Sequence, residues 1–202
     1  MPCSKCHAAS YQNEPRILFF DTELSPKRGY FYGKKYETSI QWMDKDWEFL
    51  MYSYAWNDEK VQVVQSWNER KLVVGMHKLI DQADILVAHN ITFDLGHFYA
   101  KCIKYGLPVP REPKRVCTLK MYRKLCKDGF ESNSLKDIAH ALHLPEKKEL
   151  PKGFWRDYIE TRDPKLVKIG IRYAKGDITT LRAIYKVIAP FFPPFKLKAV
   201  KT

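Results

Sequence analysis

The stretch RILFFDTELSP, residues 16–26, constrains the fold most, because four apolar residues run directly into a pair of acids. The apolar run predicts a buried strand over Arg16–Phe20. Side chains two residues apart on a strand point to the same face, so Asp21 and Glu23 are expected to converge on one spot. An isolated buried charge is too costly, so such carboxylates must be paired, protonated or bound to a metal. The stretch is therefore either an exposed strand end or a functional acid pair.

Two further acids follow apolar elements. Asp94 lies just after the predicted strand ILVAH, in the first turn of a predicted helix, where the helix dipole favours an acid. Asp177 comes four residues after Tyr173, so the two share one face of a helix. Each also has an ordinary explanation: Asp94 could be an acid that stabilises a helix N-terminus, and Asp177 could be a solvated residue beside Lys175. Taken together, four hard oxygen ligands on rigid elements are what Mg²⁺ or Mn²⁺ selects.

The rest of the chain alternates between strand and helix patterns. Residues 48–56 and 61–67 predict an antiparallel hairpin joined by the polar turn NDEK. Helices are predicted over residues 68–83, 91–106, 118–126, 132–142 and about 171–188, and a strand over residues 85–89. Residues 25–40 and 145–155 are expected to be loops. This order predicts an α/β sandwich of three layers, with a mixed central sheet flanked by helices.

Charge and cysteine content bound the class of protein. The net charge is +12, and residues 101–202 carry 24 of the 35 basic residues but only 10 of the 23 acidic ones. This asymmetry indicates either a basic face suited to phosphate backbones or a merely solubilising surface. Five cysteines fit reduced thiols better than a disulfide framework. No apolar run approaches the roughly 18 residues that span a bilayer, so a cytoplasmic protein is expected.

The N-terminus has no apolar core of a signal peptide, and its CSKCH motif is open to three interpretations. Haem attachment normally needs export, and a zinc site needs a fourth ligand with suitable spacing. A flexible tail over residues 1–14 is the interpretation favoured. A single domain over residues 15–195 and a basic C-terminal tail over residues 196–202 complete the expected organisation.

Three motifs then resemble a known family. FDTE, HNITFD and YAKGD resemble, in order and spacing, the three motifs of the DEDD exonucleases, the proofreading-type group of the ribonuclease H-like fold. Arg172 stands where the histidine branch of that family has its histidine, whereas Tyr173 matches the tyrosine branch, called DEDDy. The resemblance covers about Arg16 to Phe192 and is greatest to small stand-alone bacterial and phage exonucleases. It implies a ribonuclease H-like three-layer sandwich.

The resemblance also implies roles for five residues. Asp21 is expected to bridge two divalent ions, Mg²⁺ or Mn²⁺, and Glu23 and Asp177 to hold the ion that activates water. Asp94 is expected to support the second ion. Tyr173 is expected to orient the attacking water rather than to act as a base, because the unperturbed pKa of tyrosine is near 10.

The activity implied is metal-dependent 3′→5′ exonuclease hydrolysis of nucleic acid with a free 3′ end, with DNA favoured over RNA and single strands or 3′ ends as substrate. No membrane and no small-molecule cofactor are expected. Two alternatives stay open: a catalytically silent nucleic-acid-binding module, and a proofreading subunit that acts in trans with a polymerase. For the aromatic residues of QWMDKDW and FFPPF, base stacking and ordinary packing both stay open. The residues expected to bind substrate are Thr22, Leu24, His89, Asn90 and Phe93, with a packed core role still open for His89.

Overall fold

The computed structural model describes residues 14–31, 40–111, 113–126, 132–145 and 148–193. The expected tails and the CSKCH motif fall almost wholly outside these residues and stay predictions. Among the residues described, no helix is both long and apolar enough to span a membrane.

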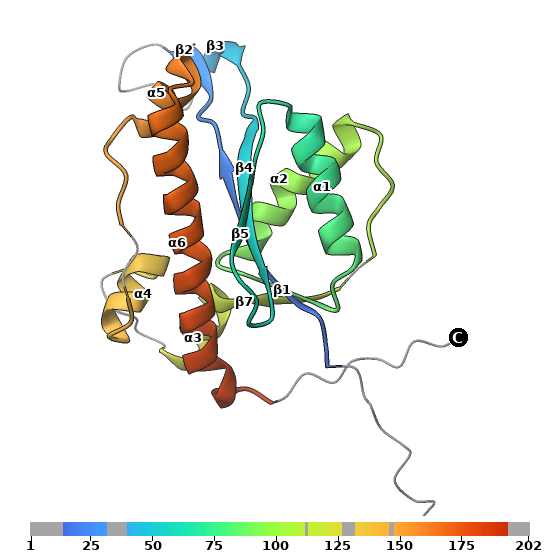
Figure 1. Ribbon diagram of the computed structural model, residues 1–202, viewed down its shortest axis with the longest axis vertical. Coiled ribbons are helices and arrows are strands. Elements are labelled where there is room, and N and C mark those ends of the chain that lie inside the picture. The colour runs from blue at the N-terminus through green and yellow to red at the C-terminus, as the bar shows by residue number, and fades with distance from the viewer. Residues whose placement is uncertain (1–13, 32–39, 112, 127–131, 146–147, 194–202) are drawn as a thin grey trace, which may run out of the picture.

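A five-stranded mixed sheet forms the middle layer of the fold (Figure 1). Its strands lie in the order β5-β4-β1-β6-β7. Strand β4 runs antiparallel to β1 and β5, whereas β6 runs parallel to β1 and β7. The sheet confirms the predicted mixed arrangement, with one hairpin and one parallel half. The strands are β1 (Ile17–Leu24), β4 (Phe49–Trp56), β5 (Gln62–Gln65), β6 (Ile85–Ala88) and β7 (Lys114–Cys117).

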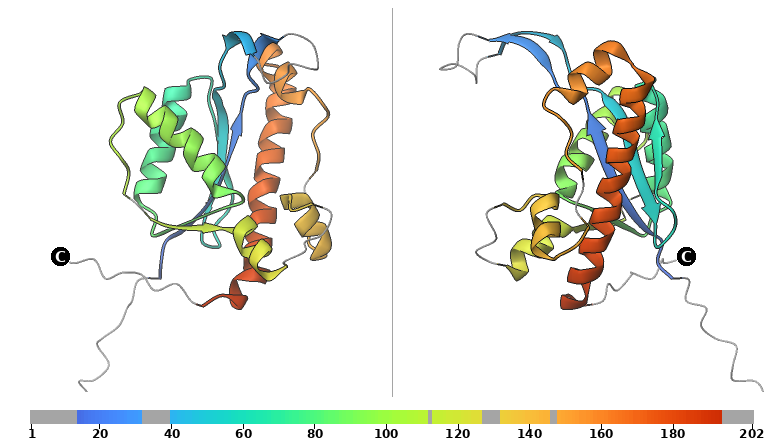
Figure 2. Two further views of the ribbon diagram at one scale, coloured as in Figure 1. Left: turned by 180° about the vertical axis from the view of Figure 1, so that it is seen from behind. Right: turned by 60° about the vertical axis from the view of Figure 1, so that its left-hand side comes forward.

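Helices cover both faces of this sheet (Figures 1 and 2). Helices α1 and α2 pack on one face, and α3, α4 and the long α6 pack on the other. Helix α5 lies against the N-terminal half of α6, where Tyr158 and Ala174 share a cluster with Met51 of β4. The helices are α1 (Glu69–Asp81), α2 (Ile91–Lys104), α3 (Thr118–Leu125), α4 (Leu135–Ala141), α5 (Phe154–Thr161), α6 (Pro164–Ile188) and the 3₁₀ turn η2 (Ala189–Phe191).

Strand β1 is central and is covered on both faces. Its residues Leu18 and Phe20 belong to the core cluster under α1 and α2, and Phe19 belongs to the cluster under α6. Because side chains alternate along a strand, Asp21 and Glu23 follow Phe19 toward α6. The residue between them, Thr22, therefore points to the opposite face, toward α2.

Strand β1 is longer than the sequence indicated. The sequence predicted the strand over Arg16–Phe20 and left open whether it still ran or was just ending at the acids. In the structure β1 continues to Leu24 because it stays paired with β4, with Asp21 opposite Ser53 and Glu23 opposite Met51. The acids thus lie within a paired strand, and pairing on that side limits how far their backbone can move. The predicted hairpin is confirmed by the pairing of β4 with β5.

Other expectations were wrong at positions where local signals are weak. Residues 25–40 were expected to be a loop, but residues 28–31 form β2 (Arg28–Phe31) and residue 40 begins β3 (Ile40–Lys45), and the two strands pair as a ribbon. Strand β7 has only four residues and was missed because its place is set by pairing with β6. Helix α5 begins inside the expected loop 145–155. Helix α6 begins at Pro164 rather than near residue 171, and the cap Asp163, which accepts from the Lys165 N–H, is the signal that was overlooked.

A buried ion pair joins the two helices of the α1/α2 layer. The Glu69 carboxylate lies 2.7 Å from the Lys101 ammonium, and it also accepts from the Tyr105 hydroxyl and the Phe49 N–H. Lys101 donates in turn to the Trp47 carbonyl at 2.7 Å. Burial favours the neutral acid, but these donors and the charge of Lys101 outweigh it, and they lower the pKa of Glu69 below its ordinary value.

Glu69→Gln is expected to lower the free energy of unfolding by about 3 kcal/mol, because it leaves the Lys101 ammonium buried without its counter-charge. The contribution of Glu69 is present above its ordinary pKa and is lost as the pH falls through the lowered pKa of the folded state, so the difference between the two proteins should shrink in acid. Urea unfolding at pH 7 and pH 3 measures both effects.

The exposed pair between Lys186 and Asp58 supplies the control. Asp58→Asn removes an exposed carboxylate instead of a buried one, and it is expected to change the free energy of unfolding far less than Glu69→Gln does. Equal losses for the two variants at pH 7 would contradict the importance of burial at Glu69.

Candidate metal-binding active site

Three carboxylates converge at one end of the central strand. Asp21 and Glu23 of β1 and Asp177 of α6 each offer an oxygen, and these oxygens all lie within 4.8 Å of one another. The alternation of β1 turns its two acids toward α6, and Asp177 lies on the buried side of that helix. Asp177 is only 4% exposed, whereas Asp21 and Glu23 are half-buried. The structure therefore brings together three of the four acids predicted from the sequence.

The fourth acid is held differently. Asp94 lies in the first turn of α2 and is 3% exposed. One of its carboxylate oxygens accepts from the Thr22 hydroxyl at 2.7 Å and from the Thr22 N–H at 3.2 Å. Since Thr22 stands between Asp21 and Glu23, this contact fixes the start of α2 against the strand that carries the cluster. Asp94 is not a member of the three-carboxylate group.

Burial gives Asp94 an unusual titration. Removal from water raises the pKa of Asp94 to about 6, although the two hydrogen bonds from Thr22 act in the opposite direction. A carboxylate in this position gains from a cation nearby, because added positive charge favours its ionised form.

The turn between β6 and α2 shapes the edge of the site. Asn90 is exposed and adopts a left-handed backbone conformation, with φ of 61°, which asparagine tolerates better than most residues. The preceding His89 lies within hydrogen-bond distance of the Thr118 hydroxyl and of the Asn133 carbonyl, at 3.0 Å each. His89 thereby joins this turn to α3 and to the segment before α4.

Tyr173 lies one helical turn before Asp177 on α6 and lines the adjoining cleft. Its ring meets the ring of Trp155 of α5 edge-on, with centroids 6.3 Å apart. Residue 170 of α6, which faces both β4 and α5, is glycine; a Cβ there would lie 3.2 Å from Met51 Cε of β4, which is tight, and 3.5 Å from Trp155 Cη2 of α5, which is an ordinary contact. The position of α5 thus sets one wall beside Tyr173.

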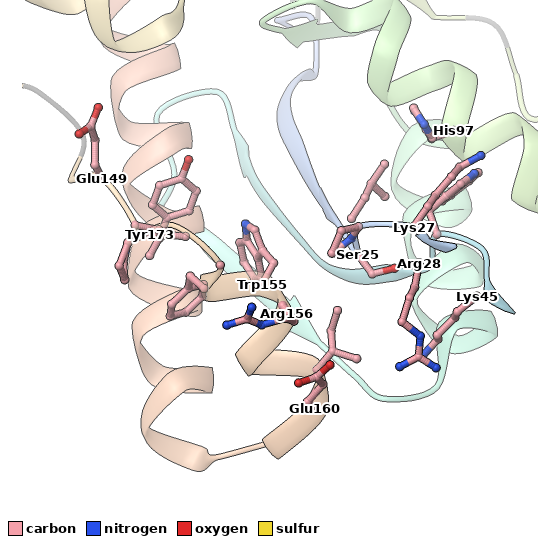
Figure 3. A pocket seen from close by; sticks show the side chains of 18 of the residues that line it. Ser25, Lys27, Arg28, Lys45, His97, Glu149, Trp155, Arg156, Glu160 and Tyr173 are labelled. Atoms are coloured by element: carbon pink, nitrogen blue, oxygen red, sulfur yellow. The ribbon is translucent and has the colours of Figure 1, made fainter. Parts of the chain in front are cut away.

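A cleft of about 1200 Å³ adjoins the carboxylates. It is lined by residues next to the acids in sequence: Leu24 after Glu23, and Phe93 before Asp94. One side carries residues of the ribbon base and the other carries residues of α5 and α6, and Figure 3 shows the two sets facing each other. The basic side chains that line the cleft are Lys27, Arg28, Lys45, Lys136 and Arg156, and the acidic ones are Glu149 and Glu160.

Three rings in tilted and edge-on contact form part of the same lining. Phe93 is 50% exposed, and its ring lies 4.3 Å from that of His97, which in turn lies 4.6 Å from that of Trp47. The spacing of four residues between Phe93 and His97 could have been found on the predicted helix. No local signal places Trp47 beside them, because it follows the ribbon, and none places Trp155 in the lining, because it belongs to the helix that was missed.

The expected substrate-binding residues therefore occupy two kinds of position. Leu24 and Phe93 line the cleft, and Asn90 is exposed at its turn. The Thr22 hydroxyl and both ring nitrogens of His89 make contacts within the protein.

Comparison with known proteins agrees with this fold. A family model described as RNase_H superfamily matches residues 18–189, and the chain belongs to that superfamily. Its fold and acidic cluster are those of a ribonuclease H-like nuclease with a candidate metal site.

Among solved structures, the chain is similar to the family B DNA polymerase from the hyperthermophilic archaeon Pyrobaculum calidifontis, with a TM-score of 0.67 and 16% identity. The match covers 88% of this chain and 25% of the polymerase chain, so this chain corresponds to about a quarter of that protein. At this identity the likeness shows the fold alone. No curated protein matches the chain.

Asp94→Asn is expected to stabilise the metal-free protein at pH 8 by on the order of 1–3 kcal/mol, because the amide keeps an oxygen for Thr22 and removes a buried charge. The raised pKa of Asp94 means that the protonated acid favours the folded state. That stability is fully present below the ordinary pKa of 3.8 and is lost as the pH rises through about 6. Urea unfolding in EDTA at pH 4.5 and pH 8 checks this.

The stabilisation should be much smaller at pH 4.5, where the native Asp94 is already largely protonated. A gain of equal size at both values of pH would mean that the amide merely packs better, and that titration of Asp94 does not control stability in this range.

Proposed function

We propose that the protein is a metal-dependent 3′→5′ exonuclease that hydrolyses phosphodiester bonds of nucleic acid, acting on single strands or 3′ ends and on DNA in preference to RNA. The observation that carries the proposal is the convergence of Asp21, Glu23 and Asp177 beside a cleft with basic and aromatic walls. The three motifs and Tyr173, which resemble the DEDDy exonucleases, supply the direction of cleavage.

The donor set fits divalent ions. Carboxylate oxygens are the ligands that Mg²⁺ and Mn²⁺ prefer, and three carboxylates in close proximity repel one another unless positive charge compensates them. Asp21, Glu23 and Asp177 would hold one ion, and Asp21 with Asp94 would support a second. Such ions supply Lewis acidity for the attacking and leaving oxygens of an in-line phosphoryl displacement.

The chain's own residues prepare the reacting bond. Tyr173 stands one turn from Asp177, and its neutral hydroxyl, with an ordinary pKa near 10, would orient the attacking water by hydrogen bonding. Leu24, which follows Glu23, and Phe93, which precedes Asp94, both line the cleft. They would position the terminal nucleotide. The Thr22–Asp94 contact and the two contacts of His89 would hold these groups in place rather than touch the substrate.

The walls of the cleft suit a nucleic-acid strand. Lys27, Arg28 and Lys45 on the ribbon side and Arg156 on the α5 side offer cations to the phosphates. Exposed Phe93 offers an aromatic face for a base.

Action in trans with a polymerase is the second candidate function, and its support is the similarity of fold to a quarter of a DNA polymerase chain. The third candidate is a catalytically silent module, which would bind nucleic acid without hydrolysing it.

Asp21→Asn and Asp177→Asn are expected to lower the rate of hydrolysis by at least about a thousandfold, equivalent to about 4 kcal/mol, because each removes a charged metal ligand. The assay uses 5′-labelled single- and double-stranded DNA and RNA with Mg²⁺, Mn²⁺ or EDTA. Products should shorten stepwise from the 3′ end, and only when metal is present.

The exposed acid Asp58 again serves as control, since Asp58→Asn should keep full activity. Metal-independent cleavage, or full activity in purified Asp21→Asn, would overturn the proposal. Metal-dependent binding without cleavage by the native protein would favour the silent module.

Tyr173→Phe is expected to lower kcat by about tenfold to a hundredfold with little change in KM, because it removes a group that orients water and leaves the ring in the cleft. Tyr99→Phe is the matched control, since the Tyr99 hydroxyl of α2 accepts an exposed hydrogen bond from Arg115 of β7. A rise in KM at constant kcat would instead assign Tyr173 to substrate binding alone.

A further inference from the structure

The β2–β3 ribbon extends the antiparallel pair β1–β4 beyond the central sheet (Figures 1 and 2). After the last sheet pair, Leu24 with Phe49, the Ser25 N–H donates to the Glu48 carbonyl and the Glu48 N–H donates to the Ser25 hydroxyl, both at 2.8 Å. The ribbon pairing then resumes at Arg28 and Lys45. The ribbon is thus joined directly to the strand that carries Asp21 and Glu23.

Two large aromatic side chains lie exposed on this ribbon. Tyr30 and Trp42 are direct cross-strand partners, so both rings project from the same face. They are 66% and 67% exposed, although an aromatic pair of this kind usually contributes by excluding water. Cross-strand pairing on so short a ribbon stabilises it only weakly, and most of both rings lies in solvent.

Three basic side chains at the base of the ribbon line the cleft. Lys27, Arg28 and Lys45 line it, as Figure 3 shows for their side chains. Their ion-pair partners Asp46, Asp44 and Glu48, at 3.4, 3.6 and 3.0 Å, are not among the residues of the lining. These pairs are well exposed and individually weak, so phosphates can replace the carboxylates at little cost.

We infer that Tyr30 and Trp42 form a stacking platform for unpaired bases of the substrate strand, on the 5′ side of the bond that is cleaved. The inference rests on the proposed function, because a strand whose 3′ end lies at the carboxylates must leave the cleft in its 5′ direction. Stacking requires an open base face, which a paired duplex does not offer along its length. The substrate class is therefore a single strand long enough to reach the ribbon.

The geometry sets that length. Tyr30 follows Glu23 by seven positions, which is at most about 24 Å of extended chain. A stacked strand rises roughly 3.4 Å per nucleotide, so at most about seven stacked nucleotides span the distance. A strand of four nucleotides should occupy the cleft alone, whereas one of twelve should also cover the aromatic pair.

The experiment measures binding of fluorescently labelled oligothymidylates of four and twelve nucleotides, in the Asp21→Asn background so that the strands stay intact. In this background the longer strand should bind more tightly. Adding Tyr30→Ala and Trp42→Ala should weaken binding of the longer strand about tenfold to a hundredfold and bring the ratio of the two affinities close to one. The Tyr30→Phe and Trp42→Phe pair should keep most of the difference, because the rings remain.

Phe191 supplies a matched control. It is an aromatic residue with 71% exposure in η2, at the opposite end of α6 from α5 and the ribbon (Figure 1). Phe191→Ala should leave the ratio of affinities unchanged. A twelve-base-pair duplex should be bound equally well with and without the alanine pair.

Tryptophan fluorescence gives a second readout that does not depend on the alanine variants folding. The longer strand should quench emission, and the single variant Trp42→Phe should lose that part of the quenching. Unchanged quenching in Trp42→Phe, an unchanged affinity ratio in the alanine pair, or an equal loss of duplex binding would each overturn the inference. Because these readouts record binding only, they are independent of whether the native protein cleaves, which the ladder assay decides separately.

Discussion

The two hydrogen bonds from Thr22 to Asp94 hold together the parts of the structure on which the site depends. Strand β1 carries acids on one face and the threonine on the other, so one residue links α2 to the strand without occupying the space between Asp21 and Glu23. The contact also explains how a carboxylate that is 3% exposed is tolerated, since a buried acid without partners would be far more costly. Burial still raises the pKa of Asp94, so the two bonds from Thr22 offset only part of the cost of burying this carboxylate.

The remaining elements arrange themselves around this strand. Helix α6 brings Asp177 and Tyr173 to the face that Asp21 and Glu23 share. On the opposite layer, the buried pair of Glu69 and Lys101 joins α1 to α2 and contacts the Trp47 carbonyl next to the cleft. The rigidity of the proposed metal ligands therefore comes from both layers, and neither face of the sheet would position the site alone.

The substrate side of the site is built from less regular elements. The ribbon and α5 form facing walls of the cleft and supply most of its cations and several of its aromatic rings. This division is physically sensible, because metal ligands need fixed positions on packed elements, whereas contacts to a phosphate backbone tolerate variation in position. It also means that substrate preference and metal binding rest on separate parts of the chain.

The layered fold and the acids of the candidate site could be predicted from the sequence. The predictions rest on alternation along β1, on helical spacing from Tyr173 to Asp177 and on the place of Asp94 after a strand, which are local patterns that neighbouring residues fix. Three features could not be predicted: β1 stays paired as far as Leu24, Asp94 binds Thr22 while the other three carboxylates form one group, and α5 and the ribbon enclose a cleft. These features depend on contacts between residues far apart in the chain, such as Trp155 with Tyr173 and Asp21 with Ser53. Local propensity carries no information about such pairings, since their energy comes from packing and strand register.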